Sequence, residues 1–173
     1  KDVVGNSMSN SYTTSNGFTS ADITSPILSQ VTVVSTPTND NTSSYTFSST
    51  EAGTITYGGS CSSSTTSATT DNNTVTFNAL ADGTYDNCTI TVTDNSSNVS
   101  NPRAITSFVI DTTAPTVAEV TAVSTPTNDN ISSYTFSSTE AGTITYGGSC
   151  SSSTTSATID NNTVTFNALA DGT

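Results

Sequence analysis

The chain repeats a long part of its own sequence at a fixed distance. Residues Val34–Thr84 return as Val123–Thr173, 89 positions further along, and they differ only where Thr42 and Thr70 become isoleucine in the second copy. Self-similarity at one period is typical of an array of like structural units. We therefore expect two tandem units, and we expect the function to belong to the array and not to a single pocket.

Each copy has the pattern of strands. Tyr, Phe, Val, Ile and Thr residues fall in short alternating runs, separated by segments rich in Asn, Asp, Gly and Pro, and no helical period occurs. The expected strands are Ile27–Val34, Ser44–Ser49, Thr54–Gly59, Thr74–Ala79, Tyr85–Thr93 and Ala104–Ile110, with a weaker one within Ser63–Thr70. About seven short strands per unit predict an all-β fold, with two antiparallel sheets packed as a sandwich.

The repeat also predicts where the units begin and end. Lys1–Asn10 resembles Thr93–Asn101, so residues 1–22 are interpreted as the terminal strand of a preceding unit. Residues 23–111 then form a complete unit, and residues 112–173 form a second unit that lacks its last two strands. Such a unit would expose an open core and an unpaired edge. Either the chain continues, or a strand of another chain fills the gap by β-augmentation.

The charge pattern excludes several classes of function. The net charge is −12, and only Lys1 and Arg103 are positive, so nucleic acid and anionic membranes are poor partners. No apolar run is long enough to predict membrane insertion. The chain has no histidine, which excludes Ser-His and Cys-His catalysis and His-based metal sites. Because the acidic residues fall almost entirely in turns, we expect no catalytic residues and no enzymatic activity.

The three cysteines follow the repeat. Cys61 and Cys88 lie in one unit, and Cys150 is the copy of Cys61, so its partner would lie outside the chain. Strand alternation lets both Cys61 and Cys88 point inward, which favours a disulfide between them. A disulfide would imply an oxidising, extracellular compartment. Two reduced core cysteines and a thiolate metal site are the alternatives.

Several phrases of the sequence resemble a known family. Phe108–Val117 (FVIDTTAPTV), Ser48–Tyr57 (SSTEAGTITY), Leu80–Tyr85 (LADGTY) and Val92–Ser100 (VTDNSSNVS) resemble bacterial immunoglobulin-like tandem repeats of the Big type. Such repeats build the extension regions of large exported surface adhesins and extracellular fibres. The resemblance implies tandem immunoglobulin-like sandwiches, the last one incomplete. The Leu80–Tyr85 phrase also resembles a tyrosine corner, in which the tyrosine hydroxyl bonds to nearby backbone.

The resemblance further implies calcium at the junctions between units. In an immunoglobulin-like array, the end of one unit meets two loops of the next, which groups Asp22, Glu51 and Asp94 at one junction and Asp111 and Glu140 at the following one. Calcium takes six to eight oxygen ligands, so two or three carboxylates are a small set. The alternative is that the aspartates hydrogen-bond within their turns while the glutamates are solvated.

Three hypotheses for the function follow. The first is a mechanically stable structural unit of an extracellular bacterial stalk, whose partners are neighbouring identical repeats. The second is a filament subunit that polymerises by strand complementation between chains. The third is a module that binds a surface glycan, since threonines alternate along several strands.

Overall fold

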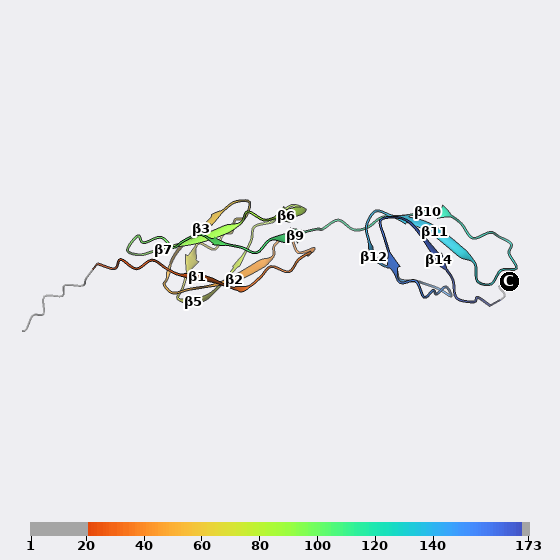
Figure 1. Cartoon of the computed structure of the whole chain (residues 1–173), viewed down its shortest axis with the longest axis horizontal. Coiled ribbons are helices and arrows are strands. Elements are labelled where there is room, and N and C mark those ends of the chain that lie inside the picture. Colours follow the sequence, from red (N-terminus) through yellow and green to blue (C-terminus); the bar gives the residue numbers. More distant parts are fainter. Residues whose placement is uncertain (1–20, 171–173) are drawn as a thin grey trace, which may run out of the picture. The chain divides into compact units, whose positions relative to one another are not determined.

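The structure is a computed structural model that describes residues 21–170. This part of the chain is all-β, with strands β1 to β14 and no helix (Figure 1). Contacts divide the chain into two compact units, Lys1–Thr112 and Thr113–Thr173. Almost all of the strand expected within residues 1–22 lies outside the described residues.

One sheet of the first unit contains three antiparallel strands. Its strand order is β1-β2-β5, and the strands are β1 (Leu28–Thr32), β2 (Ser44–Ser49) and β5 (Asp71–Thr76). Side chains of β2 and β5 alternate between buried and exposed or half-buried positions. This period of two gives the sheet one face that packs on the core.

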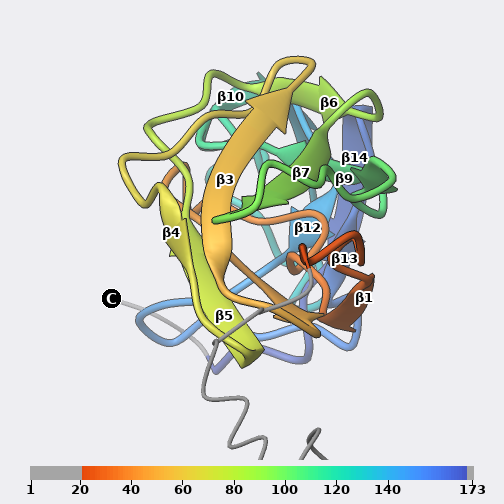
Figure 2. The same ribbon diagram turned by 90° about the vertical axis from the view of Figure 1, so that its left-hand side faces the viewer.

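The other layer of the first unit is built around an antiparallel pair of six-residue strands that are far apart in sequence. Its four-stranded sheet has the order β4-β3-β7-β8, formed by β4 (Ser67–Ala68), β3 (Gly53–Gly58), β7 (Thr89–Asp94) and β8 (Arg103–Ala104). A separate pair, β6 (Gly83–Tyr85) with β9 (Phe108–Ile110), continues the β7–β8 pairing in the same register. In Figure 2, β3 and β7 lie above β1 and β5.

The core of the first unit lies between these layers. Tyr45 and Phe47 from β2 are fully buried, as are Ile90 and Val92 from β7. One cluster of buried side chains joins residues of both sheets. The predicted all-β antiparallel sandwich is therefore confirmed, whereas the immunoglobulin-like repeat stays a prediction.

Several strands differ in extent from the prediction. The expected strands Tyr85–Thr93 and Ala104–Ile110 are each broken in two, because neither the β6–β9 nor the β7–β8 ladder extends across residues 86–88 and 105–107. Only one backbone hydrogen bond bridges this break, from the Ile105 N–H to the Cys88 carbonyl. In place of the expected strand Thr74–Ala79, β5 begins at Asp71 and ends at Thr76. The Asn73 side chain bonds the backbone of Thr69, which places the bend before the strand.

The second unit repeats the first sheet. Its strands β10 (Val117–Thr121), β11 (Ser133–Ser138) and β14 (Asp160–Thr165) have the order β10-β11-β14, in the registers of their counterparts. A short pair, β12 (Gly142–Thr143) with β13 (Ser156–Ala157), corresponds to β3 and β4. Among the described residues of this unit, no strand corresponds to β6 through β9.

Candidate functional site

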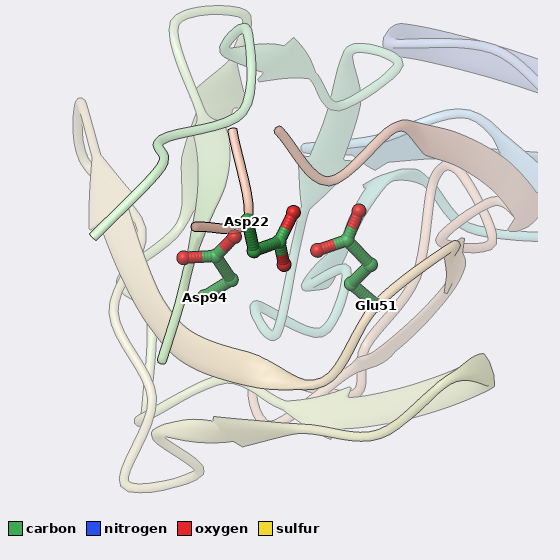
Figure 3. Close-up of side chains that lie close together, drawn as sticks. All are labelled: Asp22, Glu51 and Asp94. Atoms are coloured by element: carbon green, nitrogen blue, oxygen red, sulfur yellow. The ribbon is translucent and has the colours of Figure 1, made fainter. Parts of the chain in front are cut away.

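Three carboxylates gather at the end of the first unit where the described chain enters. Asp22 precedes β1, Glu51 lies in the turn between β2 and β3, and Asp94 ends β7. One carboxylate oxygen from each lies within 4.8 Å of the others (Figure 3). The pairing of Gly53 with Asp94 in the β3–β7 ladder brings the Glu51 turn to this loop. The structure thus brings together the acids that the resemblance assigns to the first junction.

Hydrogen bonds within the loop after β7 hold Asp94 in place. Its Oδ1 accepts the backbone N–H groups of Ser96 and Asn98, each at 2.8 Å, and its Oδ2 accepts the Asn98 side-chain amide at 2.8 Å. The same amide donates to the backbone carbonyl of Asp22 at 3.1 Å. Asp22 Oδ1 in turn accepts the N–H of Thr24 at 3.0 Å. Asn98 therefore connects the loop to the entering chain.

The carboxyl groups of this cluster differ in proton affinity. Burial raises the pKa of Glu51, and the negative charges of Asp22 and Asp94 raise it further. Burial alone would also raise the pKa of Asp94, but the hydrogen bonds from Asn98 and Ser96 outweigh it, so that pKa lies below its ordinary value. At a pH above the pKa of Glu51, its negative charge is repelled by the charges of Asp22 and Asp94, and a bound cation would relieve that repulsion.

The donor set fits a hard divalent cation in part. Carboxylate oxygens are the ligands that calcium prefers, but three carboxylates do not by themselves provide six to eight oxygens in monodentate coordination. Both oxygens of Asp94 and one of Asp22 already accept hydrogen bonds. Backbone carbonyls or water would have to complete the coordination shell.

The other two predicted calcium ligands belong to different units. Asp111 ends the first unit, where its backbone N–H donates to the Thr38 carbonyl at 2.9 Å. Glu140 lies in the second unit, where its backbone carbonyl accepts the Ser138 hydroxyl at 2.6 Å. A shared site of Asp111 and Glu140 therefore stays a prediction.

The disulfide lies at the other end of the β3–β7 ladder from the acids. Cys61 and Cys88 are bonded, with their Cα atoms 5.4 Å apart. Both side chains are buried in the core. The structure thus contains neither reduced core cysteines nor a thiolate metal site at this place. Cys150, the copy of Cys61, is a free and exposed cysteine.

One contact that sequence reasoning missed joins the first and last parts of the first unit. Thr38 forms a parallel bridge with Ile110: its N–H donates to the Val109 carbonyl at 3.1 Å, and its carbonyl accepts the N–H of Asp111. The Thr36 hydroxyl oxygen accepts the N–H of Val109 at 2.9 Å. We call these three hydrogen bonds the terminal clamp. Thr36 and Thr38 lie between the expected strands Ile27–Val34 and Ser44–Ser49, so the sequence pattern predicted no pairing there.

Comparison with protein-family models, curated proteins and solved structures finds no match. Within residues 21–170, no helix could cross a bilayer. The disulfide is compatible with an oxidising compartment.

Proposed function

We propose that this chain is a structural part of an extracellular bacterial stalk or fibre, in which immunoglobulin-like units repeat and bear tension along the array. The terminal clamp is the observation that carries the proposal. The near-identity of the two copies also supports it, because a stalk requires the same unit many times and no unique pocket.

The direction of the clamp suits a tensile load. In the first unit the described chain enters before β1 at one end and leaves after β9 at the opposite end (Figure 1). The segment at Thr38 and strand β9 run parallel and side by side. Tension between the two ends pulls these parallel segments in opposite directions. The clamp hydrogen bonds are then loaded together in shear and do not open one after another.

The disulfide supports the same function by a second route. The bond between Cys61 and Cys88 closes a loop with a sequence separation of 27 residues. Those residues cannot extend under force while the bond is intact. Such a bond also agrees with export to an oxidising, extracellular compartment.

The acidic cluster suggests how the entry end is stiffened. In this proposal a calcium ion bound by Asp22, Glu51 and Asp94 ties the entering chain to two loops of the first unit. The elevated pKa of Glu51 supports this role, because a cation would offset the repulsion among the three carboxylates.

Single-molecule force spectroscopy tests the load-bearing proposal. The full chain is pulled by its ends, and the unfolding force of the first unit is compared with that of Thr36→Val, which removes the hydroxyl acceptor of the Val109 N–H. The matched control is Thr125→Val, which changes the same position of the other copy. We expect a lower force for Thr36→Val alone. Equal forces in all three proteins would refute the clamp as the load-bearing element.

A further inference from the structure

A small pocket of the first unit lies between the segment that leads into β1 and the segment that leads into β8. Its volume is about 240 Å³, and six residues line it: Pro26, Ile27, Leu28, Asn101, Pro102 and Arg103. Liquid water takes about 30 Å³ per molecule, so the pocket has room for a group of side-chain size. We call it the seam pocket.

Side-chain hydrogen bonds join the two segments next to this pocket. Gln30, in β1, lies two residues after Leu28, and its Nε2 donates to the Thr106 hydroxyl oxygen at 2.9 Å. The Oε1 of Gln30 also accepts the backbone N–H of Thr106 at 3.3 Å. The seam pocket is therefore the open part of a seam that these bonds close, and they hold its two walls together.

The wall on the β1 side is apolar, and much of it is in contact with solvent. Ile27 is 66% exposed although it lines the pocket. Pro26 and Leu28 extend this wall, and Pro102 adds an apolar surface from the other segment. A ligand that covered Ile27 would remove apolar surface from water, which favours an apolar group in this part of the pocket.

The wall on the β8 side carries a positive charge. Arg103 is the only cationic residue within residues 21–170. It pairs with the fully buried Ile90 in the β7–β8 ladder, and directly paired residues point to the same face of a sheet, so Arg103 lies on the inner face. No acidic side chain of the described part forms an ion pair with Arg103. The seam pocket thus contains an unpaired guanidinium.

A buried hydroxyl near Arg103 also lacks a partner. Tyr45 is fully buried, and among the described residues its hydroxyl is the buried side-chain polar atom that has no hydrogen bond. Burial raises the pKa of Tyr45, and the nearby Arg103 guanidinium opposes this shift without reaching hydrogen-bond geometry. Buried polar atoms are normally paired, and an unpaired one calls for an explanation such as a bound ion or water. Two groups that can donate hydrogen bonds therefore lie close together without an acceptor.

We propose that the seam pocket binds a monocarboxylate that carries a branched apolar group of amino-acid size. The Arg103 guanidinium donates to both carboxylate oxygens, a geometry that arginine favours, while Ile27 and Leu28 contact the apolar group. A single carboxylate fits better than a polyanion, because the pocket has one cation and the net charge of −12 repels further negative groups. This inference stands whether or not the array bears tension.

Two sources offer this chemistry: a free branched acid and the last residue of a polypeptide. Asn101 lines the pocket, and its side-chain amide can bond a peptide group, which only the polypeptide end has. N-acetyl-L-leucine represents the polypeptide end and 4-methylpentanoate represents the free acid. Tighter binding of N-acetyl-L-leucine would support the first source, and equal or tighter binding of 4-methylpentanoate would support the second.

Titration of the isotope-labelled full chain with N-acetyl-L-leucine, followed by amide NMR, tests the site. We expect saturable shifts at Ile27, Leu28 and Arg103 with a Kd on the order of 1 mM, which is ordinary for so small a ligand. The matched control is N-acetyl-L-leucinamide, which keeps the apolar group but lacks the charge and should give no saturable shift. Equal binding of both compounds would overturn the proposal, as would the absence of saturable shifts with N-acetyl-L-leucine and 4-methylpentanoate at roughly ten times this Kd.

Three variants separate the charge from the apolar wall. Arg103→Gln should weaken binding by about tenfold or more, and Arg103→Lys by less, because lysine keeps the charge but cannot bond both oxygens in the same way. Ile27→Thr places the residue found 89 positions later, at Thr116, and should weaken binding several-fold. Since Ile27 and Arg103 are exposed, the NMR spectra of the free variants should otherwise match that of the unaltered protein. Undiminished binding by Arg103→Gln, together with self-association in light scattering, would overturn the proposal and show that Arg103 protects the edge of the sheet.

Discussion

Reduction of the Cys61–Cys88 disulfide should strongly destabilise the first unit and leave its fold intact. The bond closes a loop with a sequence separation of 27 residues. The chain-entropy relation gives about 3.5 kcal/mol of stabilisation for a loop of this length. A domain of this size shifts its melting temperature by about 4–8 °C per kcal/mol, so we expect a fall of roughly 15–25 °C.

Differential scanning calorimetry of oxidised and reduced protein measures this shift without any substitution. Cys88→Ser gives a second estimate, although it also places a hydroxyl in a core position that is only 1% exposed. Cys150→Ser is the matched control, because that thiol is free and exposed and its loss should leave the first unit unchanged. A shift of only a few degrees on reduction would refute the reasoning that this loop constrains the unfolded chain.

Three further predictions concern the first unit. Gly53→Ala should destabilise it by about 1–3 kcal/mol through overpacking against the Thr93 backbone in β7, whereas the matched Gly142→Ala should be nearly neutral; equal losses of stability in the two variants would contradict this close approach. Calcium should raise the melting temperature, which calorimetry measures by comparing samples with calcium and with chelator, and Glu51→Gln should abolish that response. The same melting temperature in calcium and in chelator would argue against the site. Because hydrogen bonds hold the pKa of Asp94 below its ordinary value, its contribution is present above the ordinary aspartate range and is lost as pH falls through the lowered pKa. Asp94→Asn should therefore lower the melting temperature at neutral pH, and the difference in melting temperature between the variant and the unaltered protein should become smaller as the pH falls. A difference that does not change with pH would refute the stabilising role of the Asp94 carboxylate.

Much of the fold follows from local pattern. The alternation in Ser44–Ser49 predicts β2 with its exact bounds, because Tyr45 and Phe47 both face the core. Strand alternation also predicts that Cys61 and Cys88 both point inward, and the structure contains the disulfide that this favours. The tyrosine corner expected at Tyr85 has its hydrogen bond, from the hydroxyl to the Ala81 carbonyl at 2.9 Å.

The rest depends on contacts between residues far apart in sequence. The break between β6 and β7 coincides with Asn87. The side-chain oxygen of Asn87 accepts the N–H of Ser60 at 3.1 Å, a contact between residues far apart in sequence. Likewise, the terminal clamp pairs Thr38 with a strand about 70 residues later. Period and composition contain no signal for such pairings, since each depends on where the sheets meet.

The acidic cluster shows both the reach and the limit of sequence reasoning. The resemblance to immunoglobulin-like arrays implies that Asp22, Glu51 and Asp94 meet at one end of the sandwich, and the structure places them together there. The side-chain amide of Asn98, which connects Asp94 to the entering chain, gives no comparable signal. Asparagine is frequent throughout this sequence, so one particular asparagine does not stand out.

The extension released when the first unit unfolds under force tests most directly whether a covalently locked sandwich transmits load along this chain. With the bond intact, the loop between Cys61 and Cys88 cannot lengthen under force, whereas reduction lets the chain extend over this sequence separation of 27 residues. At up to about 3.6 Å per residue, the reduced protein should give a contour-length step about 90 Å longer than the oxidised protein. Equal steps in the two states, or unfolding without a resolvable force peak, would contradict a load-bearing role.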